Sequence, residues 1–152
     1  MKNLTVILDC SGSFAENGKI EILRALRLTV ARVAKNFGAK ANFFIWRDEI
    51  NPMTSPKDVV PFGISEISAL KNFLTNYNEE ANILLLSDGT WSIDESTKIK
   101  LLLDSKNFQL IFAAVGADAN RSSNYNVSTI GGVWAPADLP AAVQKLLIGD
   151  AL

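Results

Sequence analysis

The sequence predicts an α/β protein with a doubly wound, mostly parallel sheet of six strands that is flanked by helices on both faces. Short apolar runs, which are typical of buried strands, alternate along the chain with longer segments in which apolar residues recur every three or four positions, as in amphipathic helices. The chain has 152 residues, of which 48% are apolar and 20% charged, and it shows no repeat or linker. We therefore expect residues 1–152 to form a single domain.

The first strand is the apolar run LTVIL at 4–8, which stops at Asp9 and is followed by a polar loop. ANFFIW at 41–46 is apolar at nearly every position and is typical of a central strand with both faces covered. DVVPF at 58–62 is shorter and contains Pro61, which suits an edge strand, and the segment between these two runs is expected to be a loop. The three other predicted strands are NILLLSDG at 82–89, FQLIFAAVG at 108–116 and GGVW at 131–134.

Helical periodicity of the apolar residues marks the segments between the strands. Helices are predicted at 19–37, 65–77, 92–104 and from about 139 onward. Gly38 lies where the end of the first helix favours a left-handed residue. Ser92 and Glu95 have the spacing of a capping box, which marks the start of the third helix.

Composition excludes several classes of function. The single Cys10 cannot form an internal disulfide, and the absence of His excludes a His-containing zinc site and any Ser-His or Cys-His catalytic pair. The net charge of −1 comes from evenly scattered charges, so no basic stripe suits nucleic acid. The sequence shows no signal peptide and no apolar run long enough for a membrane span, so we expect a cytoplasmic protein.

Two acidic residues, Asp9 and Asp88, each follow an apolar strand-like run. In a doubly wound sheet, ligands bind beyond the carboxyl ends of the strands, at the point where the strand order reverses. Ser11 and Ser13 alternate with Asp9 in one turn, and Gly12 allows the backbone to bend sharply there. Carboxylate and hydroxyl oxygens are the ligands of hard divalent cations. The sequence therefore predicts a site for Mg²⁺, or for Mn²⁺ or Ca²⁺.

The segment LTVILDCSGSF resembles the metal-ion-dependent adhesion site of von Willebrand factor A (vWA) domains and integrin inserted domains, and ILLLSDG resembles the second acidic motif of that family. The resemblance covers nearly the whole chain. It implies the sheet order 3-2-1-4-5-6 with the third strand antiparallel at the edge. It also implies that Ser11 and Ser13 bind the metal directly and that Asp9 and Asp88 bind it directly or through water.

The third motif of the family departs from the usual pattern. Where the family places a Thr after a Gly, this chain has Gly63-Ile64-Ser65-Glu66, so the nearest hydroxyl, that of Ser65, lies one position late. Ser65 is thus a candidate ligand, but we favour its interpretation as the N-cap of the second helix.

The function implied by the resemblance is a divalent-cation-dependent protein-binding module rather than an enzyme. An acidic group of the partner would complete the metal shell, within a multi-protein complex such as one that contains an ATPase. Phe14 and Trp91 lie within three residues of a proposed ligand and are candidates for an apolar rim that the partner covers, although packing in the core is the simpler interpretation of both.

Three other functions stay open at the level of sequence. The first is a vWA-like scaffold that has lost its metal. The second is a Mg²⁺-dependent phosphohydrolase with Asp9 as the nucleophile, which is disfavoured because Ser11 stands where such enzymes place a second carboxylate. The third is a flavodoxin-like phosphate or nucleotide binder; a P-loop is disfavoured because five residues separate Gly12 from Gly18 and because Ile20 follows Lys19.

Overall fold

Strands and helices alternate along the chain, as expected. The computed structural model describes residues 2–149. In chain order, the strands and helices are β1 (Lys2–Asp9), α1 (Lys19–Asn36), β2 (Ala39–Trp46), β3 (Ile50–Pro52), α2 (Ile67–Asn76), β4 (Asn82–Ser87), α3 (Ile93–Lys106), β5 (Gln109–Ala114) and α4 (Leu139–Ile148). Short 3₁₀ turns lie at η1 (Gly12–Ala15), η2 (Pro56–Asp58), η3 (Ser123–Tyr125) and η4 (Pro136–Asp138).

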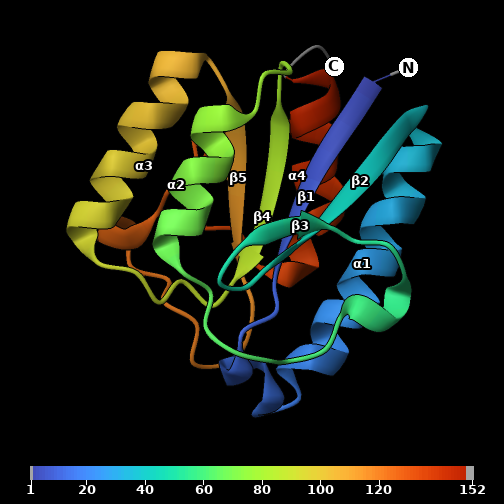
Figure 1. Cartoon of the computed structure of the whole chain (residues 1–152). Coiled ribbons are helices and arrows are strands. Elements are labelled where there is room, and N and C mark those ends of the chain that lie inside the picture. The colour runs from blue at the N-terminus through green and yellow to red at the C-terminus, as the bar shows by residue number, and fades with distance from the viewer. Residues whose placement is uncertain (1, 150–152) are drawn as a thin grey trace.

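The strands of residues 2–149 form one five-stranded sheet in the order β3-β2-β1-β4-β5. β1 is parallel to β2 and to β4, β4 is parallel to β5, and β3 is antiparallel to β2 at the edge. The chain moves outward from β1 to one side and from β4 to the other, so the strand order reverses between these two central strands (Figure 1). The predicted order is confirmed for these strands, and the prediction of six strands is wrong.

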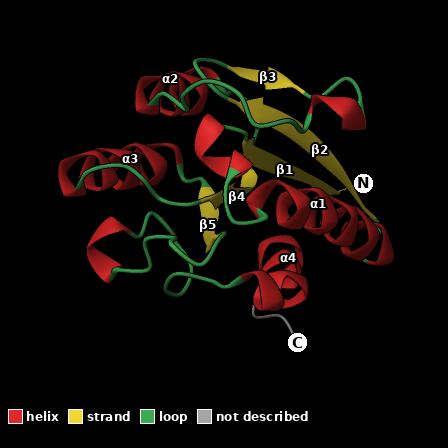
Figure 2. Cartoon of the chain, turned by 90° about the horizontal axis from the view of Figure 1, so that it is seen from below, coloured by secondary structure: helices red, strands yellow, loops and turns green. Residues whose placement is uncertain are grey.

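Helices cover both faces of the sheet. α1 and α4 lie on one face, and α2 and α3 lie on the other, as the view along the strands shows (Figure 2). β1 supplies both cores, because Leu4 and Leu8 pack with the first pair of helices and Ile7 packs with the second pair. All three side chains are fully buried, as expected for a central strand covered on both faces.

The predicted edge strand at 58–62 is not formed, and the edge strand is β3 instead. β3 contains a single large apolar residue, Ile50, among polar neighbours, and it pairs with β2 through a tight hairpin in which Arg47 N–H donates to Glu49 O at 2.9 Å. In the 58–60 segment, side chains bind the backbone carbonyls. Arg47 Nη2 donates to the carbonyls of Asp58 and Val60, and Arg24 Nε donates to that of Val59.

The predicted sixth strand at 131–134 is reduced to one parallel bridge between Ala113 and Trp134. Trp134 N–H donates to Phe112 O at 3.1 Å, and Ala114 N–H donates to Trp134 O at 2.9 Å. Hydroxyl groups complete the pairing farther along β5. Phe112 N–H donates to Ser128 Oγ at 2.8 Å, and Leu110 N–H donates to Thr129 Oγ1 at 2.9 Å. Side chains thus replace the backbone ladder that a full strand would have provided.

The predicted helices are all present, with small shifts at their ends. Gly38 has a φ of 69° after α1, as expected for a left-handed residue at a helix end. At the start of α3, Ser92 Oγ accepts a hydrogen bond from Glu95 N–H at 3.2 Å, whereas the Glu95 carboxylate pairs with Lys71 Nζ at 2.9 Å. Only half of the predicted capping box is therefore seen. None of the helices within residues 2–149 is both long and apolar enough to cross a bilayer.

Lys106 at the end of α3 caps the carboxyl end of α2. Its Nζ donates to the carbonyls of Leu74 at 3.0 Å, Thr75 at 2.8 Å and Tyr77 at 2.6 Å. Replacing Lys106 by Met is expected to lower the free energy of unfolding by about 1–2 kcal/mol, because these carbonyls lose a charged donor. Urea unfolding measures the change, with the exposed Lys40→Met as the control. Equal stability of the two variants would refute the capping role.

Candidate cation site at the switch point of the sheet

The predicted ligands meet at the carboxyl ends of β1 and β4, the two strands between which the strand order reverses. Asp9 ends β1 and Asp88 directly follows β4. The turn η1 carries Ser13, whose hydroxyl contacts Asp88, and Ser11 before it contacts Asp9. The loop before α2 supports this turn, since Gly12 N–H donates to Gly63 O at 2.7 Å. A Cβ on Gly12 would lie 3.3 Å from the same oxygen, so the two loops approach closely at the lower edge of the sheet (Figure 1).

A continuous set of hydrogen bonds joins the hydroxyls to Asp88. Ser11 Oγ lies 2.9 Å from Ser13 Oγ, and Ser13 Oγ donates to Asp88 Oδ2 at 2.9 Å. Asp88 is 2% exposed, and its Oδ1 is buried with no hydrogen-bond partner among the described residues. A buried carboxylate oxygen without a donor is costly. This oxygen therefore has an unused capacity to bind a cation.

Asp9 organises the other side of the site. Its Oδ1 accepts hydrogen bonds from Ser65 Oγ at 2.5 Å and from Ser11 N–H at 3.1 Å, and its Oδ2 accepts one from Ser87 Oγ at 2.6 Å. Burial raises the pKa of Asp9, although these hydrogen bonds act in the opposite direction. Both oxygens are already occupied by protein donors. Asp9 is therefore placed to orient the surrounding hydroxyls.

Ser65 lies in the site and is not the N-cap of α2, so the interpretation as a cap is wrong. The N-cap is Glu66, whose N–H is bound by Arg47 O at 2.9 Å, and the helix begins at Ile67. Ser65 Oγ instead donates to Asp9 Oδ1 and to Trp46 O, the latter at 3.0 Å. Ser65 lies one position after the place where the family has its Thr, but the loop still brings the Ser65 hydroxyl to Asp9.

The predicted rim residues are in the core. Phe14 is fully buried in the core beneath α1 and α4, and Trp91 is 7% exposed in the core beneath α2 and α3. The most exposed apolar side chains on the loop that supports η1 are those of Phe62, 72% exposed, and Ile64, 70% exposed. Phe62 N–H donates to Cys10 O at 3.0 Å, which fixes this loop beside the site. No sequence pattern marks this rim, because Phe62 lies in the predicted strand 58–62 and Ile64 lies in the segment between that strand and the predicted helix.

Lys19, the first residue of α1, is a component of the site that the sequence analysis missed. It is 1% exposed, and its Nζ lies 3.4 Å from Asp88 Oδ2 and 2.8 Å from Asp118 Oδ1. Burial by itself lowers the pKa of Lys19, but the two carboxylates raise it above its usual value. The ammonium is held inside the protein, which argues against the phosphate-binding alternative. The helical pattern gave no sign that a Lys at this end would be buried.

Cys10 lies between Asp9 and Ser11 in the chain, and within residues 2–149 only its backbone is hydrogen-bonded, to Trp46 O and Phe62 N–H. Its side chain is fully buried, and burial raises the pKa of the thiol to about 12. A thiol of this kind stays protonated at neutral pH and is a poor nucleophile. Cys10 is therefore a small packing residue, as the sequence suggested.

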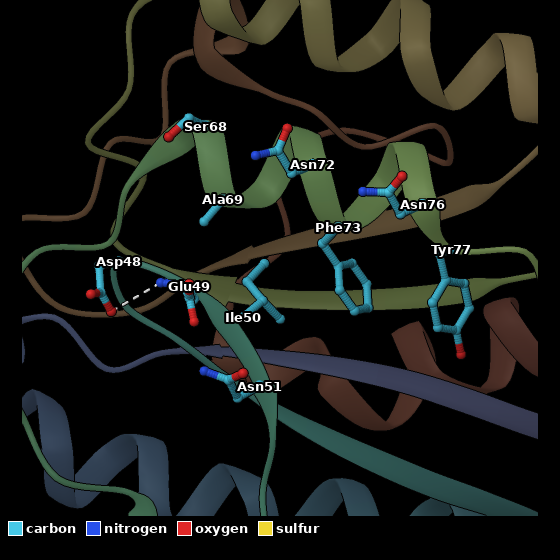
Figure 3. A pocket seen from close by; sticks show the side chains of 10 residues that line it. All are labelled: Asp48, Glu49, Ile50, Asn51, Ser68, Ala69, Asn72, Phe73, Asn76 and Tyr77. Atoms are coloured by element: carbon cyan, nitrogen blue, oxygen red, sulfur yellow. Dashed lines mark hydrogen bonds between the residues drawn. The ribbon is translucent and has the colours of Figure 1, made fainter.

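Several cavities flank this edge of the sheet, and two of them lie beside α2 or Ser65. A pocket of about 270 Å³ opens beside Ser65 and has Trp46 and Trp91 in its wall. A larger one, of about 440 Å³, lies between the β2–β3 hairpin and α2, where Ile50, Phe73 and Tyr77 line it together with polar residues (Figure 3). None of the candidate cation ligands lines the larger pocket. Among the described residues, no three or more Asp, Glu, Cys or His side chains are grouped so that they could hold a metal ion. The candidate site has two carboxylates, and its other candidate ligands are hydroxyls.

Comparisons with known proteins identify the fold. No protein-family model and no curated protein matches the sequence. A von Willebrand factor type A structure from Catenulispora acidiphila is similar, with a TM-score of 0.64 and 14% identity over 95% of this chain and 41% of that one. Proximal thread matrix protein 1 from the mussel byssus has a TM-score of 0.61 and 16% identity over 95% of this chain and 44% of that one.

The chain thus spans less than half the length of these two structures. The conserved hypothetical protein BatB from Bacteroides thetaiotaomicron is closer in length, with a TM-score of 0.60 and 12% identity over 96% of this chain and 98% of that one. Sequence identities this low show a shared fold only. This protein has the von Willebrand factor A fold.

Proposed function

We propose that this protein is a divalent-cation-dependent protein-binding module, which uses Mg²⁺ to dock an acidic side chain of a partner protein. The observation that carries the proposal is the convergence of Ser11, Ser13, Asp88, Asp9 and Ser65 from three separate loops into one hydrogen-bonded cluster at the switch point. In this proposal, the partner is a subunit of a multi-protein complex, such as a complex that contains an ATPase.

The residues present fit a hard cation. All of the candidate donors are oxygens, and the buried, unpartnered Oδ1 of Asp88 is an acceptor that a cation would satisfy. Ser11, Ser13 and Asp88 would hold the ion, while Asp9 orients Ser11 and Ser65 from behind. When bound, the cation would supply a positive charge that attracts a carboxylate of the partner.

The rim supports a protein as the ligand. Phe62 and Ile64 expose about 70% of their surfaces on the loop that contacts η1, and Val60 is 42% exposed on the same loop. Exposed apolar side chains beside a charged site are typical of protein interfaces. The partner that fits best carries an acidic residue next to apolar residues, so that the carboxylate reaches the cation and its neighbours cover Phe62 and Ile64.

One observation favours the metal-free scaffold as a second candidate. The ammonium of Lys19 lies 3.4 Å from Asp88 Oδ2 and already compensates part of the negative charge of the site. A cation-free cluster is therefore less costly than two isolated buried carboxylates would be. The scaffold would bind partners through the rim alone, and its binding would not depend on Mg²⁺.

A phosphohydrolase is disfavoured by the burial of Asp9. A nucleophile must reach the phosphorus of a substrate, but Asp9 is 1% exposed and accepts three hydrogen bonds from the protein. The position that would hold a second carboxylate is occupied by Ser11, which donates its N–H to Asp9.

The test is calorimetric titration of the chelator-treated protein with Mg²⁺ and Mn²⁺. Asp9→Ala is expected to weaken the affinity by about 10- to 100-fold, because Ser11 and Ser65 lose the group that orients them. Asp48→Ala is the matched control, since Asp48 is an exposed carboxylate that follows β2 at the same edge of the sheet. Its affinity should equal that of the wild type.

Saturable binding that is weakened only in Asp9→Ala would support the cation site. If the wild type binds neither ion at millimolar concentrations, the cation-dependent function is wrong and the metal-free scaffold takes its place. Equal losses in both variants would mean that binding reflects general negative charge rather than this cluster.

A further inference from the structure

Lys19 occupies a niche that the fold provides for it. Its aliphatic stem passes over Gly116, where a Cβ would lie 2.8 Å from Lys19 Cε, so any larger residue at that position would push the stem away. Its Nζ lies 5.6 Å from the centre of the Phe14 ring. A long cationic side chain that is 1% exposed and is enclosed in this way is fixed beside Asp88 rather than mobile at the surface.

The ammonium of Lys19 is shared between two carboxylates of different character. Asp88 is inside the candidate site, with its side chain 3% exposed, whereas the side chain of Asp118 lies outside it and is 54% exposed. The contact with Asp118, at 2.8 Å, is shorter than the contact with Asp88, at 3.4 Å. Lys19 is therefore anchored mainly by Asp118 while its charge still reaches Asp88.

Any divalent cation held by Asp88 would have this ammonium as a neighbour. Like charges repel each other strongly where water is excluded, and both ions would draw on the same carboxylate. The repulsion decreases if the ammonium moves toward Asp118 and increases if Asp118 is lost, because Asp88 then becomes the main partner of Lys19.

We propose that Lys19 is a resident counter-cation that competes with the divalent cation for Asp88, and that Asp118 sets the affinity of the site by drawing the ammonium away. This inference rests on the proposed cation-dependent function. Lys19 and Asp118 are positioning residues in this arrangement, since neither is a ligand of the cation. Their effects on affinity have opposite signs, which distinguishes this role from simple support of the fold.

The test is a Mn²⁺ titration of four proteins: the wild type, Lys19→Met, Asp118→Asn and the double variant. Met matches Lys in length without its charge, so Lys19→Met is expected to bind Mn²⁺ about tenfold more tightly, because the repulsion between the ammonium and the cation is removed. Asp118→Asn is expected to bind about threefold more weakly, an effect of the size that a single partly exposed ion pair produces. Glu16→Gln, which removes an exposed carboxylate beside η1, is the control for general electrostatics and should bind as the wild type does.

The double variant separates an indirect role of Asp118 from a direct one. If Asp118 acts through Lys19, then Asp118→Asn has no effect once Lys19 is Met, and the double variant matches Lys19→Met. If Asp118 attracts the cation directly, the threefold loss persists in the double variant, and the proposed coupling is wrong.

Several outcomes would overturn the inference. If the wild type binds Mn²⁺ and a folded Lys19→Met binds with the same or a weaker affinity, the competition is refuted while the cation site stands. If neither protein binds, the proposed function and this inference both fail. Thermal unfolding checks that each variant is folded. Lys19→Gln, which keeps a hydrogen-bond donor without the charge, takes the place of Lys19→Met if the latter does not fold, and the same tighter binding is expected of it.

Discussion

Replacing Phe14 by Ala is expected to lower the free energy of unfolding by about 3–5 kcal/mol, the range for removal of a buried aromatic ring. The ring is fully buried in the core under α1 and α4, although it lies in the middle of the site loop, between Ser13 and the start of α1. It also packs beside Lys19, whose Nζ is 5.6 Å from the ring centre. The cavity left by the ring would loosen both η1 and the lysine.

The matched control is Phe62→Ala, which removes the same ring from a surface position that is 72% exposed. Its stability in urea unfolding is expected to stay within about 0.5 kcal/mol of the wild type. The proposed function predicts that this variant loses affinity for the protein partner instead. Similar losses of stability in the two variants would mean that Phe62 is covered in solution and is not an open rim.

A Gly89→Ala substitution is expected to destabilise the protein by about 2–4 kcal/mol, because backbone strain and overpacking add together at this position. Gly89 has a φ of 76°, in the region that L side chains rarely adopt, and directly follows Asp88. A Cβ there would lie 3.0 Å from Phe112 Cζ and 3.3 Å from Asn120 O. The backbone after Asp88 must therefore move to make room.

Gly38→Ala separates strain from crowding. Gly38 has a similar φ of 69°, but a Cβ would meet nothing within 4 Å. Its cost is expected to be about 1 kcal/mol, from strain alone. Urea unfolding of the two variants gives the difference directly. Equal losses would show that the loop after β4 adapts to a side chain, and the tight packing behind Asp88 would then have no energetic consequence.

The central part of the fold could be predicted because its signals are local. The apolar runs that became β1, β4 and β5 are buried, and the helices between the strands have clear periodicity. The run that became β2 was also predicted, but 41–44 are only partly buried, because β2 lies next to the edge strand. The edges of the sheet could not be predicted in this way. β3 has three residues with one large apolar side chain, and the 131–134 segment contributes one bridge, so neither has a pattern of strand length.

The site was predicted in part for the same reason. Asp9, Ser11, Ser13 and Asp88 follow strand ends, and the fold brings such residues together whatever the loops between them do. Ser65 reaches the site because of the path of its loop, and it contacts Asp9, which is 56 positions away in the sequence. Lys19 reaches the site because its side chain is long, and it contacts Asp88, which is 69 positions away. Neither residue follows the end of a strand, so the strand pattern that places the other site residues does not place these two. The exposure of Phe62 likewise depends on a segment, 58–62, that the sequence predicts to be a strand and that the structure shows as a loop.

Residues 128–134 cover the outer edge of β5, and this cover affects whether two copies of the protein can associate through their sheets. The outer strand of a sheet is a template onto which another chain can add, and natural proteins protect such edges. Here Ser128, Thr129 and Trp134 already bind the outward N–H groups of Leu110, Phe112 and Ala114. The protein thus closes this side of its sheet with two hydroxyls and one bridge, and a neighbouring strand finds those donors occupied. The segment 128–134, which does not form the predicted strand, therefore protects the sheet against edge-to-edge association.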